Sequence, residues 1–373
     1  MNNDLLKDLT RLTCDLVAIE STSDRLDKVS QAVDYAQNYV ASITGVYFFR
    51  INVGGVSNLV ATLHNTRTPQ IFLNAHLDVV PGQAFQFQPE VRQGRIYGRG
   101  SQDMKGSAAV LLRLLRDLAA LPDPPDVGFQ FVGDEEIGGF QGTGALFEQG
   151  WRSEFFIAAE PSDLQICYAH KGAFWAEVLI PGQPAHGSRP WDSVNPIAAL
   201  RDGLLAMERL FPTPTQSAWL TTVVPTIIAS GDAGNRSPDQ TRLTLDIRHI
   251  PEDSPDEIVA RLRQAFPTAI INTPRSPGAP LATDPHDPWV EHLADCATSI
   301  TEAPAQLYRE HFATDARFYS EAGVPAVILG PIGAGLHSDD EWVDIASLGQ
   351  TYDILWRLVI EAASRKKIDH PNS

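Results

Sequence analysis

The sequence predicts an α/β protein in which one α/β domain is interrupted by a smaller α+β domain. Helix and strand patterns alternate over the first third of the chain, which is typical of the α/β class. The order of elements changes near residue 172, and a helix–strand pattern resumes after a segment rich in Pro and Gly at 272–288. We therefore expect three consecutive segments, 1–171, 172–283 and 284–373, with the two outer segments forming one domain.

The outer segments are expected to supply the strands and helices of the larger domain. Leu5, Leu9, Leu12 and Leu16 recur at helical spacing and predict an amphipathic first helix. Further helices are expected at about 25–42, at about 105–120 and from about 347 to the end. Apolar runs predict strands at 46–51, 57–63, 71–75, 127–133, 155–159 and 324–330.

The middle segment reads strand, helix, strand, strand, helix, strand, which is the ferredoxin-like order. Its first helix is expected to begin at Asn195 and Pro196, because a capping residue there precedes a proline. Its second helix follows the sequence "SPDE", which predicts a capping box from Ser254 to Glu257. The segment at 272–288 is then expected to be a linker that returns the chain to the first domain.

Composition narrows the classes of function. The 373 residues carry 29 Lys and Arg against 46 Asp and Glu, a net charge of −17, which argues against nucleic acid or an anionic membrane as a partner. No apolar run is long enough to span a bilayer, and the first twenty residues do not resemble a signal peptide. Cys14, Cys167 and Cys296 form no C-x-x-C pair, so we expect small core residues in a reducing compartment, the cytoplasm.

Polar side chains follow the predicted strands of the larger domain at the point where each strand ends. The carboxyl ends of strands in an open α/β sheet border a common crevice, so these side chains are expected to converge. Asp103, in the loop "GRGSQDMKG" before a helix, is expected to join them. The side chains at the strand ends are His76 and Asp78, Glu135 and Glu136, Glu160, and His337.

Each of these residues also has an ordinary explanation when taken alone. His76 could be a core histidine that bonds to Asp78, since the two point to the same face of a strand. Glu135 and Glu136 could be solvated, Glu160 could cap a turn, and His337 could lie on the surface. The loop around Asp103 could be a plain turn. Their joint occurrence at strand ends favours a metal site over this set of accidents.

The donor types suit a pair of divalent metal ions. Two imidazoles and three carboxylates are ligands that zinc, cobalt or manganese accept. One bridging carboxylate with two further ligands for each ion would form a two-metal site. Adjacent glutamates do not easily reach the same ion, so one of Glu135 and Glu136 is expected to bind metal while the other faces water as a general base.

The motifs resemble those of the dinuclear zinc amidohydrolases, the family of acetylornithine deacetylase, succinyl-diaminopimelate desuccinylase, aminoacylase and carboxypeptidase G. The motifs are "HLDVVP", "GRGSQDMKG", "GDEEIGG", "AAEPSD", "PAHGSRP", "TDARF" and "LHSDDEW", in this order from about residue 15 to 345. The resemblance implies a zinc-exopeptidase-like α/β/α catalytic domain with two zinc ions, or cobalt or manganese. It implies that His76 and Glu160 bind one ion, that Glu136 and His337 bind the other, and that Asp103 bridges them. It further implies that Glu135 is the general base and that Asp78 orients His76.

The resemblance also implies that the inserted ferredoxin-like domain is a lid through which the protein forms a homodimer. His186 in "PAHGSRP", Asn235 in "GNRSP" and Arg248 in "LDIR" match positions that face the substrate in this family. Asn235 could instead occupy a turn, and Arg248 could pair with a neighbour on its sheet. Arg317 in "TDAR" could belong to the site or form a structural ion pair.

We therefore expect a metal-dependent hydrolase that cleaves the amide bond of an N-acyl amino acid. Acetylornithine deacetylase is the first expectation within the family, with a desuccinylase as its neighbour. A metallo-exopeptidase that cleaves dipeptides would need no change in the metal ligands and remains the alternative. A non-enzymatic binder of amino-acid derivatives is disfavoured because Glu135 and the ligands are all present. A serine hydrolase is disfavoured because the sequence has no G-x-S-x-G motif.

Overall fold

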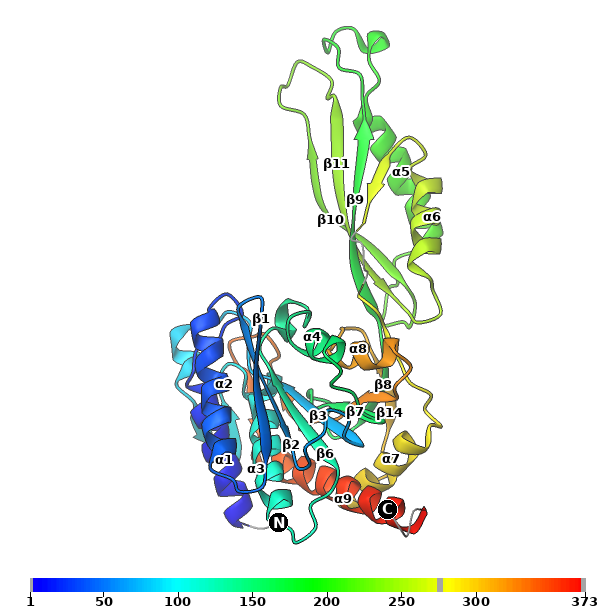
Figure 1. Ribbon diagram of the computed structural model, residues 1–373. Helices are drawn as coiled ribbons and strands as arrows, with labels where there is room; N and C mark the ends of the chain where they lie inside the picture. The colour runs from blue at the N-terminus through cyan, green and yellow to red at the C-terminus, as the bar shows by residue number, and fades with distance from the viewer. Residues whose placement is uncertain (1–2, 274–277, 370–373) are drawn as a thin grey trace. The chain divides into compact units, whose positions relative to one another are not determined.

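The computed structural model describes residues 3–273 and 278–369 and divides into two compact units (Figure 1). The first unit takes in the chain up to Tyr168, Ala282–Tyr308 and the chain from Thr314 on, and the second takes in Ala169–Leu281 and Arg309–Ala313. The divisions after Tyr168 and Leu281 fall three and two residues before the expected boundaries.

Within the described residues, the first unit is built on a sheet of nine strands, three of which run on into residues that are counted with the second unit. In order across the sheet the strands are β1 (Tyr47–Val53), β2 (Val56–Thr62), β6 (Val127–Val132), β3 (Ile71–His76), β7 (Phe155–Ala158), β15 (Ala326–Ile328), β8 (Ile166–His170) and β13 (Leu281–Ala282), with β14 (Leu307–Glu310) paired to β8. The four strands β6, β3, β7 and β15 are parallel neighbours, whereas β1, β2 and β6 pair antiparallel, as do β15 and β8.

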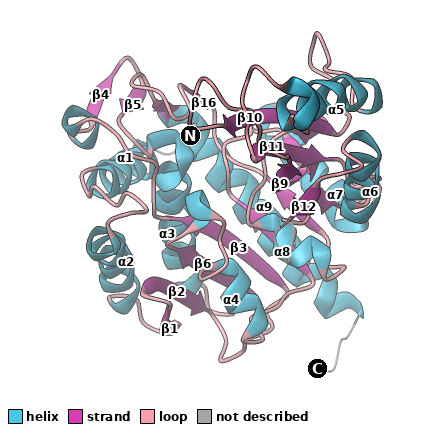
Figure 2. Cartoon of the chain, turned by 90° about the horizontal axis from the view of Figure 1, so that it is seen from above, coloured by secondary structure: helices cyan, strands magenta, loops and turns pink. Residues whose placement is uncertain are grey.

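Helices cover both faces of this sheet. Figure 2 shows α3 and α9 on one side of the strands and α4 on the other. The first face is covered by α1 (Asn3–Val17), α2 (Leu26–Ala41), α3 (Gly106–Ala119), α7 (Pro288–Thr301) and α9 (Ile345–Asp369), and the second by α4 (Thr143–Glu148) and α8 (Ala316–Glu321). The unit is therefore an α/β/α sandwich, as the sequence predicts.

The alternation of side chains along the buried strands explains the two helical layers. Leu73 on β3 belongs to the apolar core that the predicted leucines of α1 complete, and all four of those leucines are buried. The residues on either side of Leu73 point to the other face of the sheet. Phe72 lies edge-to-face with Tyr319 of α8, and Asn74 donates to the Thr143 hydroxyl of α4 at 2.9 Å.

A second small sheet in the first unit was not expected from the sequence. Its antiparallel strands, in order, are β16 (Gly333–Ala334), β17 (Trp342–Asp344), β5 (Arg95–Tyr97) and β4 (Glu90–Arg92). The expected linker at 272–288 is partly wrong, because Leu281 and Ala282 form strand β13, and residues 274–277 of it lie outside the described residues. Short helical turns complete the unit at η1 (Ala84–Phe87), η2 (Ser101–Lys105) and η3 (Glu135–Ile137).

The second unit has the ferredoxin-like order that the sequence predicts. The four-stranded sheet has the order β10-β11-β9-β12, and Leu243, Leu245 and Ile247 of β11 are fully buried against its helices. Its elements are β9 (Gly172–Pro181), η4 (Pro190–Asp192), α5 (Pro196–Leu210), β10 (Thr222–Ser230), β11 (Gln240–His249), α6 (Pro255–Ala265) and β12 (Ile270–Asn272).

Of the two helix caps predicted in this unit, one is confirmed and one is wrong. Asn195 caps α5, since its side chain accepts from the backbone N–H of Ile197 at 3.0 Å. Ser254 occupies the position before α6, but its hydroxyl makes no capping hydrogen bond, so the predicted capping box is wrong. Proline at the first position of α6 already fixes the backbone for a helix, and the side-chain cap is not required there.

None of the described helices is both long and apolar enough to cross a membrane. Cys167 and Cys296 are buried as expected, whereas Cys14 is only half-buried and packs against the core.

Candidate active site

The carboxyl ends of three parallel strands bring the predicted metal ligands together. His76 is the last residue of β3, the pair Glu135 and Glu136 opens the turn η3 after β6, and Glu160 lies two residues beyond β7. Close backbone packing holds Glu160 in place, because a Cβ at Gly330 would lie 2.2 Å from its carbonyl oxygen. A side chain larger than hydrogen at this position would push the strand end apart.

Asp103 lies between the two histidines and contacts one with each oxygen. Its Oδ1 is 2.8 Å from Nε2 of His76, and its Oδ2 is 3.2 Å from Nε2 of His337. Glu160 approaches the same His76 nitrogen at 3.7 Å, and Glu136 approaches the same His337 nitrogen at 3.5 Å. The structure thus groups two imidazole–carboxylate pairs around one shared carboxylate, which is the grouping that the family resemblance implies.

Asp78 contacts His76 mainly through its backbone rather than its carboxylate. The Nδ1 of His76 is 2.9 Å from the carbonyl oxygen of Asp78 and 3.5 Å from its Oδ1. The carboxylate instead accepts from the backbone N–H groups of Glu135 at 3.1 Å and Glu136 at 3.2 Å, and from the hydroxyl of Ser23 at 2.9 Å. Asp78 therefore fixes the histidine ring with one group and the glutamate turn with the other.

Burial and mutual repulsion raise the pKa values of two carboxyl groups in the cluster. Burial raises the pKa of Glu135 well above its ordinary range, and the nearby Glu160 carboxylate raises it further. Burial likewise raises the pKa of Glu160 to about 7, although His76 opposes this change. Such groups hold a proton more readily than a surface carboxylate does.

The two histidines and Asp103 stabilise one another's charged forms. Burial disfavours a charged imidazole at His76, but the carboxylates of Glu160 and Asp103 outweigh it and raise the pKa of His76 well above its ordinary value. Hydrogen bonds to Asp103 and Glu136 raise the pKa of His337 to about 10. Burial opposes ionisation of Asp103, yet its bonds to His337 and His76 lower its pKa strongly.

This donor set fits two divalent metal ions. The cluster is largely buried and holds more carboxylates than imidazoles, an excess of negative charge that metal ions would neutralise. The carboxylates are those of Asp78, Asp103, Glu135, Glu136 and Glu160, and the imidazoles are those of His76 and His337. A hydrogen on Nδ1 of His76 is accepted by the Asp78 carbonyl, which leaves the Nε2 lone pair for a ligand bond. His76, Asp103, Glu136 and Glu160 all belong to groups whose ligand atoms lie within 4.8 Å of one another.

Sequence reasoning missed the buried ion pair that holds the Asp103 loop. Oε1 of Glu341 accepts from the backbone N–H of Gln102 at 3.1 Å and of Asp103 at 3.2 Å. Its Oε2 accepts from the guanidinium of Arg99, and both side chains are buried. The motif "LHSDDEW" contained this glutamate four positions after His337, but a sequence does not show that a side chain bonds to a backbone 238 residues away.

Asp315 is a second carboxylate that the sequence analysis left without a role. It is buried and accepts from the Thr143 hydroxyl at 2.6 Å. Arg317, two positions later, donates to the carbonyl of Gly138 and lies against the ring of Phe318. Arg317 therefore holds the glycine turn that follows Glu136.

His186 and Asn235 lie beside each other in the second unit. His186 is exposed and bonds to the Ser188 hydroxyl at 2.8 Å, while the N–H of Gly187 donates to the carbonyl of Asn235 at 2.8 Å. A cavity of about 640 Å³ in this unit is lined by His186 together with polar residues that include Asn195, Ser193, Asp232, Arg236 and Ser237. These loops are open to solvent, unlike the metal-binding cluster.

Arg248 is paired with a residue of its own strand. Its guanidinium donates to both carboxylate oxygens of Asp246, at 2.8 and 3.2 Å, and 37% of its side chain is exposed. Burial lowers the pKa of Lys171, and the nearby positive charge of Arg248 lowers it further. Arg248 therefore has a carboxylate partner in its own strand and a second cation, Lys171, close to it.

The α/β/α sandwich and the cluster at its strand ends define a class, the metal-dependent hydrolases that use two metal ions. Residues 72–361 match the model of peptidase family M20/M25/M40. The chain belongs to this family and is a metal-dependent amidohydrolase with a site for two metal ions.

Relatives of similar length support this assignment. The chain is 29% identical over 390 residues to succinyl-diaminopimelate desuccinylase of Xanthomonas campestris pv. campestris (strain B100), which covers 96% of this chain and 99% of that protein. The desuccinylase of Xylella fastidiosa (strain M12) is 29% identical over 379 residues, covering 94% of this chain and 97% of that protein.

Solved structures share the fold at low sequence identity. Aminopeptidase PepT from Bacillus cereus has a TM-score of 0.81 and 19% identity, over 96% of this chain and 99% of that one. The YXEP protein of Bacillus subtilis, a dinuclear metal-binding peptidase of the M20 family, has a TM-score of 0.71 and 14% identity, over 97% and 99% of the two chains.

Proposed function

We propose that this enzyme hydrolyses the amide bond of N-acyl amino acids with a free carboxylate, N-succinyl amino acids first among them. The observation that carries the hydrolytic part is the placement of Asp103 between two imidazoles, with the half-buried Glu135 beside them. The succinyl group is supported by the curated relatives, which are desuccinylases that match nearly the whole chain. They favour this acyl group over the acetyl group expected first from the motifs.

The five metal ligands divide into two sets that share Asp103. His76 and Glu160 would hold one ion, Glu136 and His337 the other, and Asp103 would bridge them. Nitrogen and oxygen donors of this kind suit zinc, with cobalt and manganese as further candidates. When bound, such a pair of ions polarises the scissile carbonyl and makes water acidic enough to attack near neutral pH.

Glu135 is the group that moves the proton. It takes a proton from the attacking water as the carbon–oxygen bond forms, and it returns that proton to the amine nitrogen as the amide bond breaks. Asp78 positions it, because the Asp78 carboxylate binds the backbone N–H of Glu135 at 3.1 Å. The raised pKa of Glu135 suits a group that must hold the proton between the two steps.

Arg248 is proposed to recognise the carboxylate of the substrate. A guanidinium binds a carboxylate with two parallel hydrogen bonds, which is the geometry it already makes with Asp246. We propose that the substrate carboxylate competes with Asp246 for this group, with Lys171 adding positive charge. Asn235 is proposed to contact the substrate from the loop beside His186.

The second unit is proposed to form the homodimer interface. Strand β10 is at the edge of its sheet, and its exposed side chains include Val224, Ile227 and Ile228. An exposed apolar edge strand is a surface that a second chain can pair with. In such a dimer His186 would reach the partner's site and donate to the oxygen of the tetrahedral intermediate.

The cytoplasm is the proposed location of the protein, and its three free cysteines support this.

A substrate panel tests this proposal. The full chain, freed of metal with a chelator and reloaded with zinc, should cleave N-succinyl amino acids with a higher kcat/KM than N-acetyl amino acids, dipeptides or tripeptides. The Asp103→Asn variant, which lacks the shared charge, should cleave none of them. Preference for dipeptides would instead establish the peptidase alternative, and no cleavage by metal-loaded protein would refute the proposal.

The same panel tests the role of Arg248. Replacing the substrate α-carboxylate by an amide should lower kcat/KM at least about tenfold, since a charge-assisted bidentate bond is lost. Because Arg248 is more than a third exposed, the loss should stay below the about 3–5 kcal/mol of a fully buried pair. Arg248→Ala should erase most of the difference between acid and amide. An amide cleaved as fast as the acid by the wild type would show that Arg248 has no such role.

A further inference from the structure

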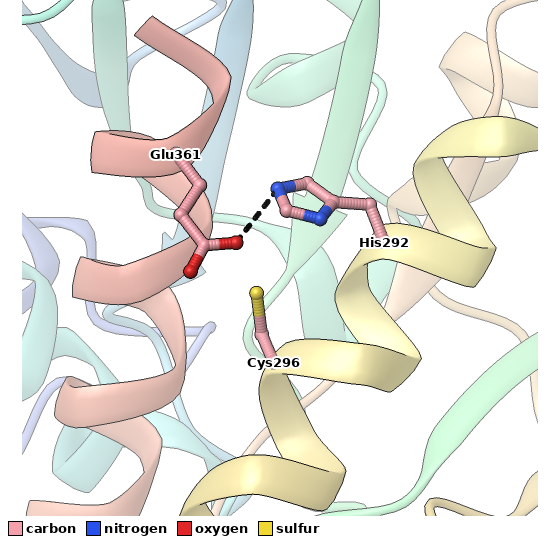
Figure 3. Close-up of side chains that lie close together, drawn as sticks. All are labelled: His292, Cys296 and Glu361. Carbon is pink, nitrogen blue, oxygen red and sulfur yellow. Dashed lines mark ion pairs between the residues drawn. The ribbon is translucent and has the colours of Figure 1, made fainter. Parts of the chain in front are cut away.

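Three metal-ligating side chains meet between helices α7 and α9, apart from the residues placed in the active site. His292 and Cys296 lie one turn apart on α7, and Glu361 points toward them from α9 (Figure 3). Helix α7 is fixed at its start by Asp287, whose side chain accepts from the N–H of Trp289 at 2.8 Å. Positions i and i+4 share a helix face, so the sequence of α7 itself puts the imidazole and the thiol side by side.

The spacing of the three side chains is close to that of a tetrahedral metal site. Their ligand atoms lie within 4.8 Å of one another, and Nε2 of His292 is 3.7 Å from Oε2 of Glu361. Ligands bound to zinc at about 2.0–2.3 Å in tetrahedral geometry stand roughly 3.5 Å apart. The imidazole and carboxylate already have nearly this separation, and the thiol, within 4.8 Å of both, needs a shift of about 1.3 Å or less.

Charge and burial favour an ion over a solvated cluster. His292 and Cys296 are 3% and 1% exposed, so the site is closed on the α7 side. A thiolate and a carboxylate together balance the charge of a divalent ion, and a neutral assembly is what a buried position tolerates. The other oxygen of Glu361 forms an ion pair with the guanidinium of Arg357, 2.8 Å from its Nε, and this pair orients the carboxylate as outer partners of metal ligands do.

The burial of Cys296 argues against a catalytic thiol. A nucleophilic cysteine must meet its substrate, and such residues are partly exposed. The structure therefore offers two roles for the cluster, an ion pair between His292 and Glu361 or a metal site that includes the sulfur. A simple ion pair needs no thiol at this position.

We propose that His292, Cys296 and Glu361 bind one divalent transition-metal ion that accepts sulfur, such as Zn²⁺ or Co²⁺, and that this ion links α7 to α9. Binding releases the thiol proton of Cys296 to solvent, and the imidazole binds in its neutral form. With one thiolate, one imidazole and one carboxylate, the fourth position is open for water. The role is structural, because the site joins two packed helices.

Cobalt distinguishes this site from the catalytic one. The residues proposed for catalysis include no cysteine, so a thiolate-to-cobalt charge-transfer absorption in the near ultraviolet reports the α7–α9 site alone. The full chain, freed of metal and titrated with Co²⁺, should bind three ions and develop this absorption in proportion to one of them. Cys296→Ala should bind two ions and show no such absorption, whereas the matched variant Cys14→Ala should behave as the wild type.

A second variant keeps the test decisive if Cys296→Ala does not fold. Glu361 is 38% exposed in its side chain, so Glu361→Gln leaves the helix packing intact. This variant should weaken cobalt binding at the thiolate site by more than the ~10–100-fold that loss of an outer hydrogen bond costs. The proposal is overturned if the wild type binds two ions without the absorption, if Cys296→Ala retains it, or if Glu361→Gln binds with unchanged affinity.

Discussion

The two units of this enzyme hold their candidate site residues in opposite ways. In the first unit the residues contact one another, with Asp103 bonded to both His76 and His337 and with Asp78 bonded to the turn of Glu135. In the second unit His186 is exposed, and Arg248 pairs with Asp246 two positions away in its own strand. One set is a connected network, and the other is a set of separate groups.

The difference shows which steps each unit can perform by itself. The first unit contains every residue that we propose as a metal ligand or as the base, so in the proposed mechanism metal binding and proton transfer need no residue of the second unit. Among its described residues, the second unit offers donors and positive charge but no cluster of metal-ligating side chains. Its residues can act on a substrate or a partner chain, and their contribution should depend on what is bound.

The largest effect is expected at the base of the first unit. Glu135→Gln should lower kcat by about 10²–10⁴-fold, because the amide can neither accept nor return the proton. Metal content should stay at the wild-type value, since Glu135 is not among the proposed ligands. Turnover and metal analysis on the same preparation check both points.

The neighbouring residue supplies the matched control. Glu136→Gln should lower metal affinity, because this carboxylate faces His337 at 3.5 Å in the proposed second metal set. If Glu135→Gln retained near-normal rates, or if it lost metal as Glu136→Gln does, the division of labour between the two glutamates would be wrong.

The next effect concerns the second unit and tests whether its exposed donor acts on a partner chain. His186→Ala should lower kcat by about 10²–10³-fold, the usual cost of removing an oxyanion donor. A mixed dimer of His186→Ala and Glu135→Gln chains should regain activity, because one of its two sites would have both groups. The assay is activity against mixing ratio, with each homodimer as its own baseline.

A verified heterodimer without recovery would show that His186 acts within its own chain or not at all. In that case the exposure of His186 would reflect a surface loop, and the contrast between the two units would have no catalytic meaning.

The fold and the clustering of the candidate metal ligands could be predicted from the sequence because they follow local rules. Polar residues directly after apolar strands mark the crevice of an α/β sheet, and helical spacing placed Leu9 and Leu16 on the buried face of the first helix. The role of Glu341 and the carbonyl contact of Asp78 depend on exact side-chain directions, and so does the choice of Asp246 as the sheet partner of Arg248. Sequence spacing gives proximity along one strand or helix, but it does not give those directions.

The smallest effect is expected at Glu341, which touches no proposed ligand side chain and would act through the backbone of Asp103. Glu341→Gln should place an amide N–H group against the Arg99 guanidinium, two donors without an acceptor, and so displace the loop that carries Asp103. We expect metal affinity to fall by about 10–100-fold, as it does when an outer partner of a metal ligand is lost. Added zinc should then restore most of the turnover, whereas it should not rescue Glu135→Gln.

The control for Glu341 is a carboxylate of the same unit that forms an ion pair away from the cluster. Asp117 pairs with Arg113 at 2.6 Å and accepts from Tyr352 at 2.8 Å, so Asp117→Asn also breaks an ion pair. Asp117→Asn should lower thermal stability while leaving zinc affinity unchanged, and Glu341→Gln should lower both. Equal zinc affinity in Glu341→Gln and wild type would mean that the buried pair stabilises the fold without positioning Asp103. The connected network of the first unit would then end at its metal ligands and Asp78.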